Sequence, residues 1–185
     1  MDSQIVTLKG SGADTFVNFS TPRAAAQAIR KVHDMAWKPL HIINKDATSV
    51  GVVLTPAGME KSVGIISLTS QKDPTDPRWK NDPGMKEWLN WMRKYYPDGD
   101  TTDDNNVYGY NYAQTLVQIL KQCGDDLTRE NVMRQAANLR NLELPMLLPG
   151  IRINTSPSDY FPIKQAQMVR FDGKEWERFG ELIQN

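Results

Sequence analysis

The chain has 185 residues, with 22 Lys and Arg against 22 Asp and Glu and a hydrophobic content of 39%, which suits a globular protein of one or two small domains. Its net charge of zero argues against nucleic acid or an anionic membrane as a partner held by bulk electrostatics. Cys123 is the one cysteine and cannot form an internal disulfide. The sequence has neither a signal-peptide start nor an apolar run of membrane-spanning length. The composition therefore indicates a cytosolic protein or an internal piece of an exported one.

The first predicted elements alternate between helix and strand. Residues Gln4–Leu8 read as the last turns of a helix, and Thr15–Phe19 predicts a short strand. A helix is predicted over Ala24–Val32, with Thr21 as its N-cap and Pro22 at its first position. Such a unit places polar side chains and free helix N–H groups at the carboxyl end of a strand. In open α/β sheets that is where small ligands bind.

The same alternation continues to about residue 70. Pro39–Ile43 predicts a second buried strand, Val50–Met59 a short apolar helix, and Val63–Leu68 a third strand. Repeated strand–helix units imply right-handed crossovers and a parallel sheet. The predicted fold class is therefore α/β.

The composition changes at Gln71–Pro83, which contains Asp-Pro pairs that disfavour helix and hold the chain extended. We interpret this segment as a crossing between two lobes. Apolar stripes then predict amphipathic helices over Gly84–Tyr96 and Asn105–Gln122, the second stripe consisting of Ala113, Leu116, Val117 and Leu120. Thr128 is predicted to cap a further helix with its apolar residues inward, namely Val132, Met133, Ala136 and Ala137. These helices need a sheet that the chain does not obviously supply.

The end of the chain is predicted to be irregular and then β-structured. Leu142–Pro162 is rich in proline, with Ile151–Asn154 as a possible short strand. Gln165–Phe171 and Lys174–Phe179 flank the pair Asp172-Gly173, which is a strong signal for a β-hairpin. The whole chain thus predicts a parallel sheet with flanking helices plus a C-terminal β-hairpin.

Reactive chemistry is not favoured by any motif. His33 and His41 have no Cys or carboxylate at metal-ligand spacing, and Asp98–Asn105 lacks the glycine and the distal glutamate of a calcium loop. No Gly-x-Ser-x-Gly sequence is present, and Cys123 has no histidine near it in sequence. We expect no catalytic residue, no metal and no cofactor.

Polar residues at the predicted strand ends are the candidate binding residues. Hydroxyls, an amide and a carboxylate without an activated group describe a site that binds without reacting. The alternative is that each is only a cap or a turn residue. The candidates are Ser20, Thr21, Asn44, Asp46, Ser49 and Ser67.

Several segments, taken in order, resemble one family. They are Ile5–Asp14, Ser20–Pro22, Ala24–Arg30, Lys72–Pro77, Tyr108–Tyr110 and Arg170–Gly173. Their order and spacing resemble the solute-binding proteins of branched-chain amino-acid type ABC importers, which have the type I periplasmic binding fold. The resemblance runs over essentially the whole chain but covers only the C-terminal half of a usual member.

The resemblance implies how the chain is divided. Residues 1–70 and 150–185 would form part of the second lobe, 71–83 an inter-lobe crossover and 84–149 the helical part of the first lobe. It also implies a periplasmic location, a solute held in the cleft between the lobes, and the membrane permease of an ABC transporter as partner.

Second-lobe contacts carry over in part. By the resemblance, Ser20 lies at the position where leucine-type members have an aromatic contact. Asp46 lies near the position where members have an acidic residue that contacts the ammonium group of the ligand. Lys45 would suit a carboxylate. The implied solutes are branched-chain amino acids, their amides or aromatic acids.

Two alternatives stay open. One is a truncated scaffold that binds no solute and forms a homo-oligomer through the helices of residues 84–122. The other is a small α/β enzyme with Asp46 as a general base.

Overall fold

The computed structural model describes residues 1–184 of the chain. Strands form at the predicted β-branched and aromatic runs, and helices form at the alanine-rich and amphipathic runs. The helices are α1 Asp2–Gly10, α2 Pro22–Asp34, α3 Thr55–Ala57, α4 Pro83–Tyr95, α5 Asn105–Cys123 and α6 Arg129–Ala136. The shorter turns are the 3₁₀ helices η1 Lys45–Ala47, η3 Glu60–Ser62 and η4 Pro77–Trp79 and the π-helix η2 Val50–Leu54. The strands are β1 Thr15–Asn18, β2 Leu40–Ile43, β3 Ile66–Thr69, β4 Gln165–Phe171 and β5 Trp176–Gln184.

The strands form one five-stranded sheet in the order β1-β2-β3-β4-β5. The pairs β1–β2 and β2–β3 are parallel, as the strand–helix alternation predicts. The pairs β3–β4 and β4–β5 are antiparallel. The predicted C-terminal hairpin is therefore confirmed, and it extends the parallel strands into a single mixed sheet.

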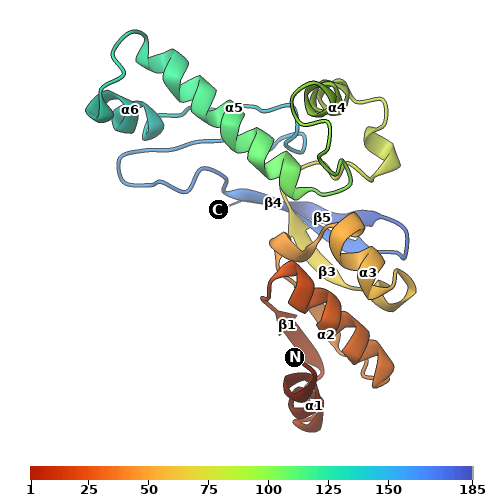
Figure 1. Cartoon of the computed structure of the whole chain (residues 1–185). Helices are drawn as coiled ribbons and strands as arrows, with labels where there is room; N and C mark the ends of the chain where they lie inside the picture. Colours follow the sequence, from red (N-terminus) through yellow and green to blue (C-terminus); the bar gives the residue numbers. More distant parts are fainter. Residues whose placement is uncertain (185) are drawn as a thin grey trace.

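The sheet and the helices α4–α6 occupy different parts of the molecule (Figure 1). Helices α1, α2 and α3 lie beside the sheet, while α4, α5 and α6 lie beyond β4 and β5. The α/β class expected from the sequence is confirmed. The division into lobes at residues 70, 84 and 150 stays a prediction.

The β1–α2 unit forms as its residues dictate. Thr21 has the extended backbone of an N-cap and Pro22 is the first helical residue, but the Thr21 side chain makes no capping hydrogen bond. Ala25 and Ile29 are buried on the inner side of α2 in a core that also contains Ile43 of β2. Packing, rather than the cap side chain, therefore fixes where α2 begins and which side faces the sheet.

Two local predictions were only partly right. The helix expected over Val50–Met59 is divided into the π-helix η2 and the short α3, because Pro56 cannot donate a backbone hydrogen bond and Gly58 takes a positive φ of 102°. The hairpin loop is longer than the Asp172-Gly173 pair, since the backbone N–H of Asp172 donates to Glu175 O over 3.1 Å. The Asp172 carboxylate closes this loop by accepting from the N–H groups of Lys174 and Glu175.

The crossing segment is held by its own aspartates. Asp76 caps η4 and Asp82 caps α4, each with a proline at the next position. The Lys72 ammonium is buried and donates to Asp82 Oδ1 over 2.7 Å and to Pro145 O over 2.7 Å. Asp76 and Asp82 therefore each start a helical turn, and Asp73, which precedes Pro74, starts a turn closed by the Asp76 N–H. The crossing is thus turned and ordered, whereas the sequence predicted an extended chain.

The helices α4–α6 pack on one another and on the irregular residues that follow α6. Trp88 of α4 and Met146 are fully buried in one cluster with Val107 of α5. A second cluster joins Ile119 of α5 to residues such as Ile151. These clusters use a side of α5 that differs from the predicted stripe.

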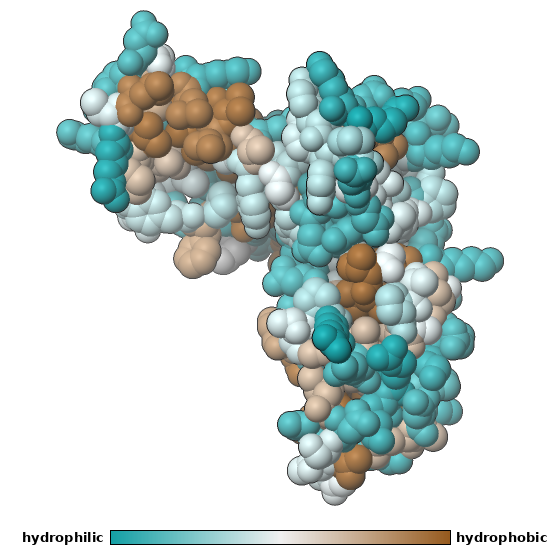
Figure 2. All heavy atoms as spheres, viewed as in Figure 1, coloured by the Kyte–Doolittle hydropathy of each residue, from teal (hydrophilic) through white to brown (hydrophobic). Residues whose placement is uncertain are grey.

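The predicted inner stripe of α5 is exposed. Leu116, Val117 and Leu120 are 51%, 48% and 40% exposed, and Ala113 is also exposed. Figure 2 shows strongly hydrophobic side chains gathered over the far end of α5 and α6. Met133 of α6, expected to face inward, is 57% exposed. The predicted apolar stripe is present on the helix, but the described residues provide no sheet to cover it. We call this side the outer face of α5 (Ala113, Leu116, Val117 and Leu120).

Candidate functional site

The carboxyl ends of β1 and β2 lie side by side. Asn18 and Ile43 are register partners in the parallel pair, and the N–H of Asn44 donates to Asn18 O over 3.1 Å. The turns that follow the two strands are therefore neighbours at one edge of the sheet. Phe19, the residue after β1, is 80% exposed there, so this edge offers an apolar ring as well as polar groups.

Ser20 and Thr21 lie in the turn between β1 and α2. The Ser20 hydroxyl donates to Asn18 Oδ1 over 2.6 Å. Thr21 is exposed, and its side chain makes no cap bond to the α2 backbone. The Thr21 hydroxyl is thus available to a ligand, whereas the Ser20 hydroxyl is engaged with a neighbouring side chain.

Asn44 and Asp46 follow β2 in the turn that contains η1. Asp46 is exposed. The Asn44 Oδ1 atom is buried and has no hydrogen-bond partner within residues 1–184. A buried carbonyl without a donor is uncommon in proteins and needs an explanation.

Ser49 and Ser67 are withdrawn from the edge. Ser49 is 1% exposed, and its side chain caps η2 by accepting from the N–H of Val52 over 3.3 Å. Ser67, also 1% exposed, lies within β3 and donates from its hydroxyl to Ile43 O over 2.8 Å. The structure thus brings Ser20, Thr21, Asn44 and Asp46 to one edge, while Ser49 and Ser67 make internal bonds.

The first turns of α5 face this edge, which the sequence did not predict. The Lys45 Nζ atom lies 4.5 Å from the ring centre of Tyr108 and donates to Ser70 Oγ over 2.7 Å. Thr48 Oγ1 lies 3.5 Å from Asp104 Oδ2, and Gln71 Nε2 donates to Asp104 O over 3.1 Å. The segment Tyr108–Tyr110 is one of those that resemble the family, but its position in the sequence does not predict a contact with Lys45.

The electrostatics of this contact are unusual. Burial, reinforced by the nearby carboxylates of Asp73 and Asp103, raises the pKa of Asp104 to about 7. Thr48 Oγ1 donates to Lys45 O over 2.7 Å and is at the limit of donating distance, 3.5 Å, from Asp104 Oδ2. A hydrogen bond with the Ser49 side chain acts in the opposite direction and lowers the pKa of Asp104. Burial also lowers the pKa of Lys45 and raises that of Tyr108 far above its usual range.

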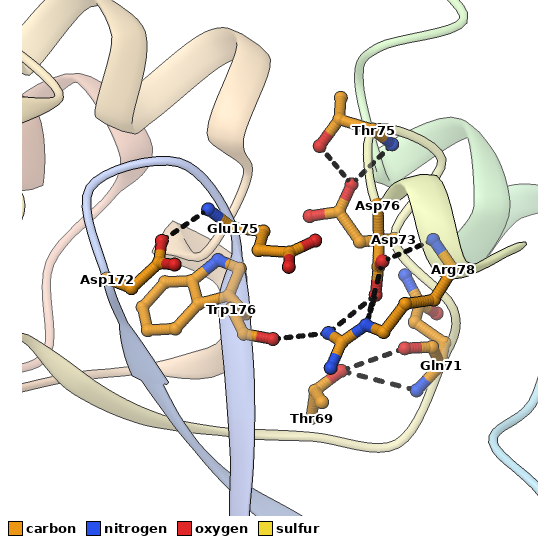
Figure 3. A network of polar contacts seen from close by, with 9 residues as sticks. All are labelled: Thr69, Gln71, Asp73, Thr75, Asp76, Arg78, Asp172, Glu175 and Trp176. Atoms are coloured by element: carbon orange, nitrogen blue, oxygen red, sulfur yellow. Dashed lines mark hydrogen bonds and ion pairs between the residues drawn. The ribbon is translucent and has the colours of Figure 1, made fainter.

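A polar network fixes the crossing against the hairpin (Figure 3). Arg78 donates from Nε to both carboxylate oxygens of Asp76 over 2.9 Å and also bonds to the backbone O of Trp176. The Trp176 indole N–H in turn donates to Thr48 O over 2.8 Å. This chain of bonds links the crossing, the hairpin and the turn after β2.

A small cavity of about 30 Å³ lies within this network, lined by residues that include Gln71, Asp73, Asp104 and Trp176. A cavity of that size holds one or two water molecules. It is too small for an amino acid or an aromatic acid.

Residues 1–184 offer neither a cluster of metal ligands nor a membrane-spanning helix. That part of the chain contains no group of three or more His, Cys, Asp and Glu side chains arranged to hold a metal ion. None of its helices combines the length and apolar character needed to cross a bilayer.

The chain is similar to one family of known proteins. The family model described as periplasmic binding protein matches residues 1–175. No curated protein matches the chain. A branched-chain amino acid ABC transporter protein from Thermus thermophilus, with bound valine, has a TM-score of 0.77 at 15% identity, with 99% of this chain and 49% of that chain covered.

Two further solved structures extend the comparison. A leucine-binding protein from Thermotoga maritima has a TM-score of 0.69 at 14% identity, covering 98% of this chain and 48% of that one. A fatty acid ABC transporter substrate-binding protein from Thermomonospora curvata has a TM-score of 0.65 at 19% identity, covering 100% and 47%. The chain therefore spans about half the length of the structures it matches.

Proposed function

The chain belongs to the periplasmic binding protein family, and on that premise we propose that it binds a small amino or aromatic acid at the carboxyl edge of its sheet. Family membership and the type I periplasmic binding fold, both expected from the sequence, are confirmed. In this proposal the solute lies in a cleft between two lobes in the periplasm and is delivered to the membrane permease of an ABC importer. The similar structures include a transporter protein with bound valine, a leucine-binding protein and a fatty acid transporter binding protein, which supports a carboxylic acid as solute.

The observation that carries the proposal is the composition of the strand edge. Phe19, Thr21 and Asp46 are exposed at the ends of two adjacent parallel strands, which offers an apolar ring, a hydroxyl and a carboxylate without a nucleophile activated by a base. Such an edge suits recognition. Family and fold are those of transport binding proteins, so they give no support to an enzyme with Asp46 as general base.

The test is a thermal melt of the purified chain with valine, leucine, isoleucine, benzoate and the matching amides. A ligand at about one hundred times its dissociation constant adds about 2.7 kcal/mol to the free energy of unfolding. For a domain of this size that raises Tm by roughly 5–10 °C. Asp46→Asn should remove the shift produced by the amino acids, whereas Asp14→Asn, at the opposite end of β1, should keep it. A cooperative melt that no ligand moves would contradict the proposal.

A second candidate function rests on the outer face of α5. This exposed apolar face is favourable for a homo-oligomer that covers it and binds no solute. Light scattering over a dilution series tests this candidate. A dimer that dissociates on dilution and is abolished by Leu116→Glu would favour the scaffold, and a monomer at all concentrations would exclude it.

A further inference from the structure

Lys45 is a cation at the strand edge whose positive charge is not matched locally. It is half-buried, and its ammonium group donates to Ser70 Oγ, a neutral acceptor, over 2.7 Å. The carboxylates that act on its pKa are Asp46, which is exposed, and Asp104. Withdrawing a cation from water without a close anion is unfavourable, so an anion brought by a ligand would be bound strongly here.

The two carboxyl groups of the protein that lie near Lys45 attract its ammonium group only weakly. Asp104 is 6% exposed and has a pKa of about 7, so much of it is protonated and neutral at pH 7 and below. Asp46 is surrounded by solvent, which screens its attraction for Lys45. Neither carboxyl group is therefore a full counter-ion for the ammonium group.

Tyr108 supplies a free hydrogen-bond donor beside Lys45. Its ring centre lies 4.5 Å from the Lys45 Nζ atom, and its hydroxyl is buried with no partner anywhere in the described residues. A buried hydroxyl without a hydrogen bond costs stability. Tyr108 lies in the first turns of α5, where the helix dipole also favours a negative charge.

Two buried side-chain amides close to these residues in the chain or through the sheet are unsatisfied as well. Asn111, one turn beyond Tyr108, is 5% exposed, and neither of its side-chain polar atoms has a partner in residues 1–184. On the strand side the Nδ2 group of Asn18 is buried and, within the same residues, free, and Asn18 is bonded through its backbone to Asn44, the neighbour of Lys45. Free amide donors suit a carboxylate, because each of its oxygens accepts hydrogen bonds.

We propose that the carboxylate of the solute binds where the turn after β2 meets the first turns of α5, with Lys45 as counter-ion and the Tyr108 hydroxyl as donor. The inference rests on the proposed function and narrows it. The protein selects acids over the corresponding amides, and it does so through Lys45.

The test is isothermal titration calorimetry with paired probes, namely valine against valinamide and benzoate against benzamide. The wild-type chain should bind at least one acid more tightly than its amide by about tenfold or more. Lys45→Met should weaken binding of that acid by about tenfold or more and leave the amide unchanged. Tyr108→Phe, which removes only the hydroxyl, should weaken the acid by roughly fivefold.

Two further variants serve as controls, one for misfolding and one for the loss of any exposed lysine. Lys45→Arg keeps the charge and should retain most of the affinity for the acid, which shows that Lys45→Met acts through charge rather than through misfolding. Lys38→Met removes an exposed lysine before β2 and should change nothing. Equal wild-type affinity for acid and amide, or a folded Lys45→Met that still binds the acid, overturns this inference alone. Binding of neither acid nor amide overturns the proposed function together with it.

Discussion

The buried carboxyl of Asp104 should make the protein more stable in mild acid than at neutral pH. Burial raises its pKa from the ordinary 3.8 to about 7. Between these values the folded state binds a proton that the unfolded state has released. The free energy of unfolding therefore falls as the pH rises from about 4 to about 7, and above that range Asp104 adds no further change.

The magnitude follows from the size of the pKa difference. A shift of one pKa unit corresponds to about 1.36 kcal/mol, so the full difference is about 4 kcal/mol. The fall between pH 5 and pH 7 is about 2 kcal/mol, because Asp104 is already half ionised at pH 7. The pKa of Asp73 is raised in the same direction by burial, so its effect adds to the slope. Carboxyls with lowered pKa values, such as Asp82, act in the opposite sense but at lower pH, below their ordinary pKa near 4.

Urea unfolding at pH 5, 6, 7 and 8 measures the slope. Asp104→Asn keeps the shape and the hydrogen-bonding capacity but cannot ionise, so it should match the wild-type stability at pH 5 and exceed it by a few kcal/mol at pH 8. Asp98→Asn, an exposed carboxylate on the same loop, should retain the wild-type slope. A wild type whose stability is constant from pH 5 to pH 7, or an Asp104→Asn variant with an unchanged slope, would refute the reasoning.

Three substitutions test how the helices are held, each by urea unfolding at one pH. Ile119, whose side chain is 8% exposed, should lose about 2–5 kcal/mol of unfolding free energy on substitution by alanine. Its control is Leu116→Ala on the same helix, where the side chain is 51% exposed and the loss should be less than about 0.5 kcal/mol. Equal losses would mean that the outer face of α5 is covered in solution. Trp88→Ala, in a fully buried side chain, should cost about 3–5 kcal/mol, and a loss below 1 kcal/mol would place Trp88 outside the core. Thr128→Ala removes the cap hydrogen bond from the Asn131 N–H and should lower the free energy of unfolding by about 1 kcal/mol. Thr128→Ser keeps the hydroxyl and should lower it by almost nothing. A Ser variant as unstable as the Ala variant would show that the hydroxyl is not the stabilising group.

Local chemistry explains why most elements could be predicted. The β1–α2 unit carries its strand, its Pro22 and its alanine-rich helix within a few residues, and the hairpin carries its own turn at Asp172. Antiparallel pairing of β4 with β3 could not be predicted in this way. The register joins Ile66 to Arg170, and no short-range signal specifies which strand the hairpin joins.

The candidate site shows the same limit more sharply. Thr21 and Asp46 could be found because each follows a strand, and the structure leaves both exposed at the edge. Ser67 is also polar but lies within β3, where its hydroxyl donates to Ile43 O inside the sheet. The contact of Lys45 with Tyr108 joins a strand-end turn to a helix far along the chain, and only the fold reveals it.

The hydrogen bond from the Trp176 indole to Thr48 O joins residues 128 positions apart, and this has a consequence for synthesis on the ribosome. Until β4 emerges, the edge of β3 has no strand beside it, because its antiparallel partner runs from Gln165 to Phe171. A nascent chain that ends before the hairpin is a parallel ribbon with an open edge, which is a template for wrong pairing. Strands β4 and β5 therefore complete the sheet begun by β1–β3, and a chain that stops short of them should be removed by proteases rather than accumulate as a smaller folded protein.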